Sequence, residues 1–515
     1  MIYLIEMTAY DLTTNQVITR RFGSVGYTTL PTDSPANISF DEHTIQPGSY
    51  ERSVFANGTT SGESDIAFGF IELANADGSL DSLTNVSVDG RELKIYGLQD
   101  KMTPWSQRTL LFVGTMEQIE FSWTKVTIRI RDALFKLRQN IQPVLYLGTT
   151  TAGGQDTAEG TAETLKDKPK PLLFGKVFNI LPILANQFDR IYQVSSRGFN
   201  SGIVVRDAGV PLTFTSNYAT IAALRSSSLT SGQFATATSL GLFRVGGNPL
   251  GDITVDVSEG ADGSRSAART VRRILEGFGY TTANFSSTDI EALHSLNPAE
   301  VGVWIGADNI DPLTVISSLL DSIGATMTPD RLGVLRFFRV GVPSGSPVFT
   351  FERYLILNQG SGIERVATND AGRGVPAKKV TINYAQNYTL QSGTALAGAT
   401  TETLKAFLKE TYRTVKAEDS SVATAFLLAP ELEFTTCLTL QADAQAEANR
   451  RLALYKVKRD RFRIPVKNEF VSTLELGAVV SLKVNRFSLN AGKLFIVIGI
   501  NENFKTGVTT VDIFG

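Results

Sequence analysis

The segment from residue 440 to residue 515 constrains the fold most, because its hydrophobic period changes from that of a helix to that of a strand. Apolar residues recur at i, i+4, i+8 and i+11 on one helical face: Ala444, Ala448, Leu452 and Tyr455. Val480, Leu482 and Val484 then alternate with polar residues. An apolar run at 494–498 and a last turn at 505–507 complete the pattern. A helix packed beside a small antiparallel sheet or barrel is therefore predicted.

Residues 1–147 are expected to form an all-β domain. Val126, Ile128 and Ile130 alternate with polar residues, which is typical of a half-buried strand. Reversal dipeptides separate the neighbouring runs: Asn57-Gly58, Asp77-Gly78 and Asp89-Gly90. Such spacing predicts a strongly twisted small sheet or barrel. The N-terminal stretch carries Glu6 within its apolar run and lacks a basic region, so it is expected to be a first strand and not a signal peptide.

The next segments differ in composition. Residues 148–171 are rich in Thr, Gly, Ala and Lys without periodicity, which predicts a linker or mobile loop. Residues 172–262 are expected to be a second β-rich domain, with turns at 208–209 and 246–248.

Residues 263–345 are predicted to be an α/β domain. One helix is indicated by residues at helical spacing, namely Ala267, Val271, Ile274, Leu275 and Phe278, with Gly279 as its C-terminal cap. Asp311-Pro312 begins a second helix, because Asp is a favoured N-cap and Pro a favoured first helical residue. A strand pair at 325–327 and 334–338 would cover the second helix.

Residues 346–515 are expected to form the last domain, β-rich and containing the helix 440–458. Val380, Ile382 and Tyr384 alternate with polar residues, whereas 403–417 fits a helix and a strand equally well. The fold class is thus mainly β with an α/β insertion, an α+β multidomain chain of 515 residues.

Several stretches resemble the central hub protein of phage tail baseplates. At the C-terminus they are AEANRRLALYKVKRDRF, LELGAVVSLKVNRFSLNAGKLFIVIGINENF and VTTVDIFG. Further stretches are ISFDEHTIQPGSYERSVF, IELANADGSLDSL, KPKPLLFGKVFNILPIL and IYQVSSRGF. The residues matching the family's closing barrel are Gly477, Val479, Val480, Leu482, Arg486, Phe487, Leu489, Gly492, Phe495, Val497, Ile498, Gly499, Ile500, Phe514 and Gly515. These residues shape a fold and include no catalytic signature.

The resemblance implies two tail-tube-like β-barrels, 1–147 and 346–515, flanking the β-rich and α/β middle domains. It implies a structural virion protein at the tail tip, made in the host bacterial cytoplasm, with three copies presenting six similar barrels around a channel for DNA ejection. The implied partners are the distal tail protein, the tape-measure protein and a central fibre or tip protein. DNA would pass through the lumen without sequence-specific binding. No enzymatic activity and no cofactor are expected.

Composition argues for protein partners. Lys and Arg number 49 against 51 acidic residues, so no global field would attract nucleic acid or a membrane surface. No stretch approaches the roughly 20 apolar residues that span a bilayer. The single cysteine, Cys437, cannot form an intrachain disulfide and is expected to be a small buried hydrophobe.

The candidate sites of chemistry are weak, and no catalytic, cofactor or metal residue is assigned. His43 lies beside Asp41 and Glu42, but no third metal ligand follows at suitable spacing. His294 is expected at a surface or cap position of a short helix. Residues 75–81 resemble the start of a calcium loop, yet Val86 occupies the position of the bidentate glutamate, so a turn is preferred. Residues 259–263 lack the lysine of a phosphate loop and are interpreted as a flexible boundary.

One local charge excess lies at 450–463: Arg450, Arg451, Lys456, Lys458, Arg459, Arg461 and Arg463. Charge runs usually face water, so a solvated helix end is the simpler interpretation. The functional alternatives are a subunit contact or a channel lining that guides DNA through phosphate attraction.

Two other functions remain open from the sequence. A cell-wall or capsule glycan hydrolase would need two carboxylates held about 5–10 Å apart in a cleft. A receptor-binding adhesin would attach to cells without tube symmetry.

Overall fold

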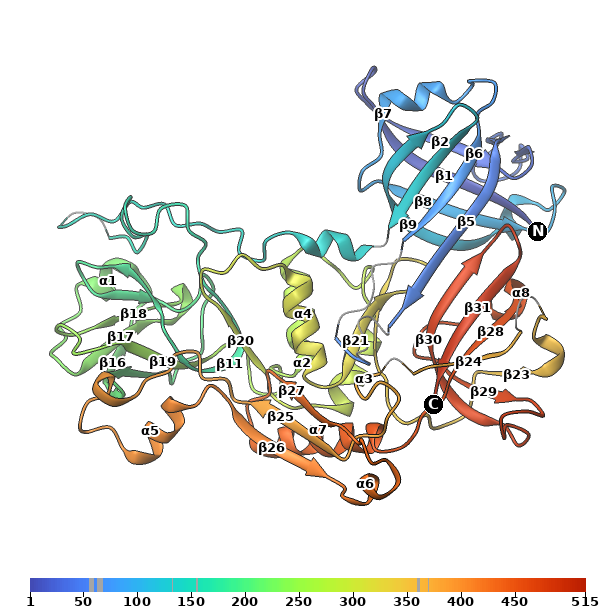
Figure 1. The fold of residues 1–515 in the computed structure, drawn as a ribbon. Helices are drawn as coiled ribbons and strands as arrows, with labels where there is room; N and C mark the ends of the chain where they lie inside the picture. Colours follow the sequence, from blue (N-terminus) through green and yellow to red (C-terminus); the bar gives the residue numbers. More distant parts are fainter. Residues whose placement is uncertain (55–59, 63–67, 132, 154–155, 359–361, 369) are drawn as a thin grey trace.

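The computed structural model describes residues 1–515 except 55–59, 63–67, 132, 154–155, 359–361 and 369, and it is mainly β with several helices. In Figure 1 the N-terminal and C-terminal sheets lie against each other at one end of the molecule, and a second β-rich part lies at the other end. A helical region with α2 and α4 lies between them. A mainly β multidomain chain with helices is thus confirmed.

The N-terminal sheet is built from ten strands of the first 131 residues. They are β1 (Ile2–Asp11), β2 (Gln16–Gly23), β3 (Tyr27–Thr28), β4 (Ser39–Glu42), β5 (Thr44–Ser53), β6 (Phe68–Ala74), β7 (Val86–Ser87), β8 (Glu92–Leu98), β9 (Thr109–Phe121) and β10 (Lys125–Arg131). The strand Ile2–Asp11 confirms the prediction for the N-terminal stretch. On β10 the side chains of Val126, Ile128 and Ile130 are buried, as their alternation predicts.

The C-terminal sheet uses strands from the last part of the chain. They are β23 (Phe349–Glu352), β24 (Glu364–Val366), β28 (Arg461–Lys467), β29 (Val479–Lys483), β30 (Lys493–Asn503) and β31 (Val508–Phe514), with the short helix α8 (Asn468–Val471) after β28. Apolar residues on its inner face form a core of their own, including Ile464, Phe495 and Phe514.

The two terminal sheets are one sheet, and this corrects the expectation of two closed barrels. Among the described residues the strand order runs β24-β28-β31-β30-β5-β6-β10-β9-β8-β1-β2-β4-β3, an open path that does not return to its start. The edge of each unit is hydrogen-bonded to the other unit, which satisfies backbone groups that a closed barrel would have paired internally. The alternation of apolar and polar residues predicted the strands, but it could not predict which strands of the two units pair with each other.

The β-rich middle part contains two five-stranded sheets, ordered β15-β14-β19-β11-β20 and β12-β13-β18-β17-β16. The bounds are β11 (Leu172–Ile180), β12 (Ile183–Asn186), β13 (Ile191–Gln193), β14 (Val204–Asp207), β15 (Val210–Pro211), β16 (Thr213–Asn217), α1 (Ile221–Arg225), β17 (Gln233–Ala237), β18 (Leu242–Val245), β19 (Ile253–Ser258) and β20 (Gly302–Ile305). A core that includes Val177, Phe243 and Val255 joins the two sheets.

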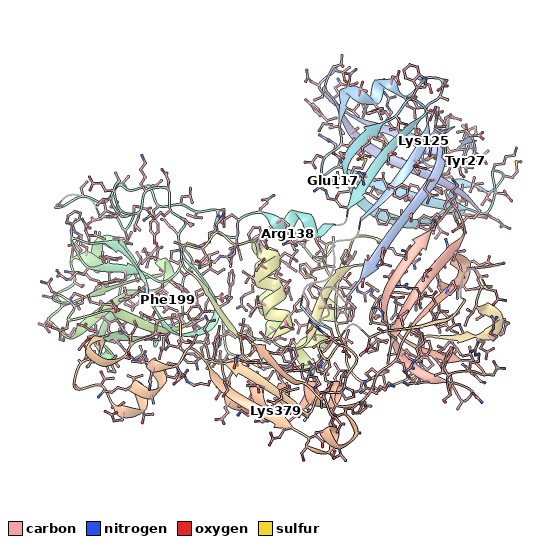
Figure 2. The ribbon with its side chains drawn as sticks, in the orientation of Figure 1. Tyr27, Glu117, Lys125, Arg138, Phe199 and Lys379 are labelled. Carbon is pink, nitrogen blue, oxygen red and sulfur yellow. The ribbon has the colours of Figure 1, made fainter. Side chains whose placement is uncertain are left out.

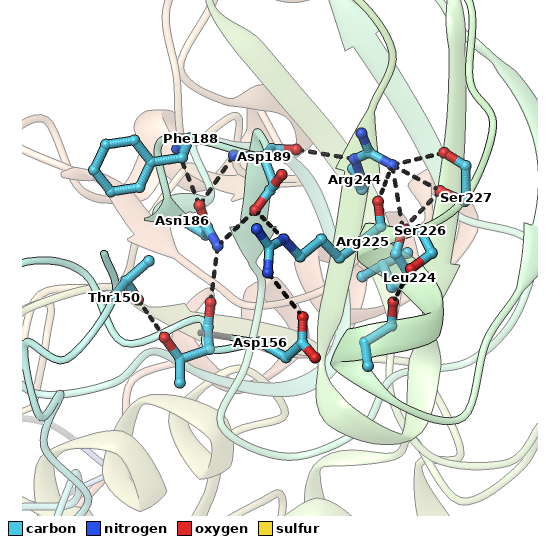
Figure 3. A network of polar contacts seen from close by, with 12 residues as sticks. Thr150, Asp156, Asn186, Phe188, Asp189, Leu224, Arg225, Ser226, Ser227 and Arg244 are labelled. Atoms are coloured by element: carbon cyan, nitrogen blue, oxygen red, sulfur yellow. Dashed lines mark hydrogen bonds and ion pairs between the residues drawn. The ribbon is translucent and has the colours of Figure 1, made fainter. Parts of the chain in front are cut away.

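The described part of segment 148–171 has no helix or strand, but it is held against this middle part. The N–H of Gly160 donates to the carbonyl of Ala185 (2.7 Å), and the Asn186 amide donates to the carbonyl of Thr157 (2.9 Å). Asp156 pairs with Arg225 at 3.0 Å in the same polar network (Figure 3). The described part of the segment expected to be a linker or mobile loop thus has hydrogen bonds and an ion pair to the middle part.

The α/β part confirms the predicted elements. Its bounds are α2 (Ala267–Gly277), α3 (Ser287–Leu296), α4 (Pro312–Asp321), β21 (Ala325–Pro329) and β22 (Leu335–Arg339). Asp311 caps α4 by accepting a hydrogen bond from the N–H of Thr314, and it also pairs with Arg138 at 3.3 Å. Figure 2 labels Arg138 between the N-terminal sheet and α4.

Residues 346–515 divide between two cores. The elements β25 (Lys379–Tyr384), α5 (Glu402–Lys409), β26 (Arg413–Glu418), α6 (Ser421–Ala425), β27 (Glu431–Thr435) and α7 (Gln441–Tyr455) interrupt the strands of the C-terminal sheet. Ala444, Ala448 and Leu452 of α7 pack, as their spacing predicts, in the core of the α/β part together with β25. The ambiguous stretch 403–417 forms the helix α5 first and then the strand β26.

Candidate functional site

The seam between the terminal sheets is built on one shared strand, β5. Its residues Ser49 to Ser53 pair with Asn503 to Gly499 of β30 in antiparallel register. On its other side β5 pairs with β6 from Thr44 to Glu51. The same stretch of backbone is thus hydrogen-bonded to the N-terminal unit on one side and to the C-terminal unit on the other. The ladder therefore continues one sheet through both units.

Phe504, in the turn between β30 and β31, enters the core of the opposite unit. Its side chain is 5% exposed and packs with Ile95 and the other core residues of the N-terminal sheet, its ring 5.3 Å from that of Tyr3. Gly48 of β5 allows this approach, because a Cβ there would lie 2.9 Å from the Phe504 ring. The N–H of Phe504 also donates to the carbonyl of Gly48 at 3.0 Å.

Four charged residues meet at the seam, and we call them the seam charge cluster: Arg52, Arg331, Glu475 and Glu502. Arg52 Nη1 lies 2.6 Å from Glu475 Oε2. Arg331 Nε lies 3.3 Å from Glu475 Oε1, and its Nη2 lies 3.1 Å from Glu502 Oε1. The cluster joins β5, the β21–β22 turn and the C-terminal sheet with two positive and two negative charges. Burial removes charged groups from water, so the loss of one partner is costly.

Arg331 is the centre of this cluster. Its side chain is 8% exposed and donates to the carbonyls of Val471 and Leu474, both at 3.1 Å, and of Ser472. The neighbouring Asp330 has its pKa raised, because burial outweighs the backbone hydrogen bonds that it accepts. The β21–β22 turn of the α/β part is therefore anchored in the C-terminal unit by one side chain.

Residues 60–62, between β5 and β6, form a second attachment of the N-terminal unit. The Thr60 hydroxyl lies 2.5 Å from that of Tyr455 on α7, and the Ser61 hydroxyl donates to Asp321 Oδ1 at 2.5 Å. The N–H of Gly62 donates to the carbonyl of Ala325 at 2.8 Å. Burial raises the pKa of Tyr455. The predicted Asn57-Gly58 turn lies outside the described residues.

A second buried group, the α7 charge cluster, consists of Asp321, Glu447, Arg450 and Arg451. Glu447 and Arg451 are each 1% exposed, with Glu447 Oε1 2.7 Å from Arg451 Nε and 2.6 Å from Arg450 Nη2. The Arg451 guanidinium lies 4.1 Å from the centre of the Phe434 ring. Burial acts to raise the pKa of Glu447, but the hydrogen bonds and charge of the two arginines lower it overall.

The interpretation of 450–463 as a solvated helix end is therefore wrong for Arg451, which is buried. Sequence shows the charge of Arg451 but not the acidic partners that allow its burial. Further along, Arg461 and Arg463 both pair with Asp512, and Lys456 pairs with Asp419 at 3.1 Å. Five of the seven basic residues thus have an acidic partner within the chain.

The weak candidates from the sequence have structural roles. His43 Nδ1 lies 3.0 Å from the carbonyl of Ala74, and His294 Nδ1 lies 2.8 Å from the Ser266 hydroxyl. Asn75 donates to Asp81 and accepts from the N–H of Leu80, which makes a turn. No group of three or more metal-binding side chains occurs within the described ranges. None of the helices in the described part of the chain is long and apolar enough to span a bilayer.

Two further predicted positions also serve the fold. Cys437 is half-buried, and burial raises the pKa of its thiol to about 11. In the segment 259–263, Glu259 pairs with Arg273 at 2.9 Å and accepts from the N–H of Gly175, so it belongs to a structural contact. Sequence reasoning missed the seam residues, because their partners lie far apart in the chain and no motif marks them.

Comparison with known proteins gives structural likeness only. No family model and no curated protein matches the sequence. A tail protein from Neisseria meningitidis aligns over 99% of this chain and 96% of its own, with 8% identity and a TM-score of 0.40. The 43 kDa tail protein of prophage MuSo2 from Shewanella oneidensis aligns over 100% and 98%, with 9% identity and a TM-score of 0.40. The prophage tail protein gp18 from Listeria monocytogenes aligns over 99% and 94%, with 10% identity and a TM-score of 0.39.

Proposed function

We propose that this chain is a structural virion protein, the central hub of a phage tail baseplate. The observation that carries the proposal is the shared sheet: β5 joins the first and last β units through a hydrogen-bonded ladder to β30. A rigid pair of β units per chain suits the wall of a tube, and three copies would place six units around one axis. Of the stretches that resemble hub proteins, four lie in these units: ISFDEHTIQPGSYERSVF, IELANADGSLDSL, LELGAVVSLKVNRFSLNAGKLFIVIGINENF and VTTVDIFG.

The open ends of the sheet support a role in assembly. Residues 16–21 of β2 pair only with β1 in the described part of the chain, and β23 pairs only with β29. Exposed strand edges are hazards unless a neighbour or a charge protects them. In the proposed hub, neighbouring copies and the distal tail protein cover these edges, and DNA passes along the axis without base-specific contacts. The tape-measure protein and a central fibre or tip protein would occupy the two openings.

No observation in the described residues favours either of the two alternative functions. A glycan hydrolase needs two carboxylates facing a substrate, whereas Glu475 and Glu502 of the seam are paired with arginines. An adhesin needs a receptor-binding surface, and no surface in the described residues points to one receptor.

Mass photometry and electron microscopy of the purified chain, alone and with its distal tail protein, test the proposal. We expect particles of three copies with a central pore, in which both terminal units line the pore. Monomers that release sugars from cell-wall preparations would support the hydrolase instead. Particles without a pore along a shared axis would contradict the hub.

A further inference from the structure

The β-rich middle part ends in an open strand, β16. It is the last strand of its sheet and pairs, in the described part of the chain, with β17 alone. All of its residues are exposed, and in Figure 1 it lies at the end of the molecule opposite the terminal sheets. The N–H of Thr213 donates to the carbonyl of Gly232, on the β17 side, at 2.8 Å. Because main-chain groups alternate along a strand, the N–H and C=O of Phe214 point to the open side.

The other open strands within the described ranges are protected against pairing with a foreign chain. β15 and β21 contain proline, β2, β22, β23, β24, β26 and β27 contain charged residues, and β3 and β7 have two residues each. β12 and β20 are uncharged, but neighbouring segments cover them: Gly160 donates to the carbonyl of Ala185, and Gly302 donates to that of Cys437. The sequence of β16, Thr-Phe-Thr-Ser-Asn, has neither charge nor proline. Proteins protect their strand edges, so an edge left in this state indicates a partner strand.

A cavity of about 180 Å³ lies beside this open strand. Its buried floor includes Phe199, which Figure 2 labels, and Ile203. Its rim includes the exposed residues Gly202, Phe214 and Asn217, two of which belong to β16. The exposed rim lets a side chain enter from the side on which β16 has no neighbour.

The walls of the cavity suit an apolar group. The described residues that line it are all uncharged. Its polar groups at one end are already paired with one another, because the Thr236 hydroxyl and the N–H of Thr238 both donate to Asn217 Oδ1, at 2.8 and 3.0 Å. A protein cavity of roughly 150 Å³ accommodates benzene, so this cavity has room for one branched aliphatic side chain.

A second copy of β16 is a poor occupant. It would bring Phe214, whose ring lies 5.6 Å from that of Phe234 in its own chain and forms a wall of its own cavity. The cavity of each copy would then stay empty. An extended segment of another protein has no such conflict. It would exchange main-chain hydrogen bonds with Phe214 and turn alternate side chains to the face where the cavity opens.

We propose that β16 receives an extended segment of a partner protein as the next strand of its sheet, with one branched aliphatic side chain in the cavity. The hydrogen bonds along the edge supply affinity, and the cavity supplies specificity. The identity of the partner as another tail protein rests on the proposed function; the site itself does not.

The test uses the full-length chain and three peptides. The first is Ac-Thr-Thr-Ile-Thr-Thr-NH₂, the second has alanine in place of isoleucine, and the third is the first with its three central amides N-methylated. Ligand-detected NMR should give a Kd about tenfold lower for the first peptide than for either control, because the second fills less of the cavity and the third cannot pair along the edge. Phe214→Pro lacks the edge N–H, whereas the matched variant Phe214→Val keeps it. The proline variant should bind the first peptide at least tenfold more weakly than the valine variant.

The proposal is overturned if the first peptide does not bind, if all three peptides bind equally, or if the two variants bind alike. It is also overturned if the chain forms dimers that Phe214→Pro dissociates, because β16 is then a self-contact. If the proline variant does not fold, hydrogen exchange of the unaltered chain decides. The first peptide should slow amide exchange in 212–217 and the N-methylated peptide should not, and an unchanged pattern refutes the site. None of these measurements depends on a trimer, so the hub proposal and the strand site fail separately.

Discussion

The seam charge cluster and the ion pairs on the outer face of the N-terminal sheet use the same chemistry in different surroundings. Arg129 and Glu120 approach to 2.5 Å on β10 and β9, but their side chains are 49% and 44% exposed. Arg331 and Glu502 are 3.1 Å apart and are 8% and 1% exposed. Figure 2 labels Lys125, which pairs with Glu72 on the same sheet as the outer Arg129–Glu120 pair.

The shorter distance does not make the stronger contact. Water and salt screen the outer pairs, and exposed pairs of this kind contribute about 0–1 kcal/mol. At the seam Arg331 and Glu502 are shielded from water, so each depends on its partner. Burial thus decides which arginines hold the molecule together, and the following changes test that view.

Arg331→Met should have the largest effect, a loss of about 3–5 kcal/mol in the free energy of unfolding. It leaves the buried Glu502 without its cation, removes one of the two cations of Glu475, and leaves three carbonyls without this donor. Urea unfolding followed by tryptophan fluorescence measures it, with Trp105 reporting on the N-terminal sheet and Trp304 on the middle part. A loss below about 1 kcal/mol would show that the seam does not depend on this charge.

Phe504→Ala should cost about 3 kcal/mol, near the lower limit for a buried phenylalanine, because an adjoining cavity lets water enter the space. The two terminal units should then unfold at different urea concentrations. Trp123→Ala is the control, since that side chain is 93% exposed and its removal should leave the urea midpoint of unfolding unchanged. Equal effects of the two substitutions would contradict the role of Phe504.

Glu447 should make the α7 charge cluster sensitive to acid. Its pKa in the folded chain lies below the value of about 4.3 for an unfolded glutamate. Its contribution to stability is therefore complete above pH 4.3 and is lost as the pH falls through the lower folded value. Glu447→Gln should lower the melting temperature at pH 7 and flatten its fall below about pH 4. If the melting temperature of Glu447→Gln falls with acid as steeply as that of the unaltered chain, Glu447 is not the source of the acid sensitivity.

Tyr455→Phe should cost about 1–2 kcal/mol, because the Thr60 hydroxyl is buried and would lose its partner. The effect should appear as faster amide exchange in residues 60–62. Tyr354→Phe, at a side chain that is 79% exposed, should change neither stability nor exchange.

Lys125→Ala should have the smallest effect, with a shift of less than about 2 °C in the melting temperature. Its pair with Glu72 is exposed, and added salt should already weaken it in the unaltered chain. If Lys125→Ala lowered the free energy of unfolding as much as Arg331→Met, buried and exposed ion pairs would not differ in their contribution to stability.

Local patterns predicted local structure well. The helices α2, α4 and α7 begin and end near the residues that their spacing and caps indicated, because these signals act within a few residues. Asp311 caps α4 as predicted. The alternation on β10 also correctly separated its buried and exposed faces.

The seam could not be predicted in this way. Alternation shows which face of β5 is apolar but not that Glu51 lies opposite Asn501, 450 residues away. The charge of Arg451 is visible in the sequence, whereas its burial depends on Asp321 and Glu447 reaching it in the folded chain. The open shared sheet replaced the expected barrels for the same reason, since partners are chosen by tertiary contacts.

The distance between β5 and β30 along the chain also sets a delay during synthesis. A ribosome adds about 5–20 residues per second, so the outer edge of β5 waits roughly 20–90 s for its partner strand. Until then that edge is open to other nascent chains. Residues 499–503 complete the sheet edge that β5 begins. A product truncated before them would leave the N-terminal unit with an unprotected, aggregation-prone strand edge.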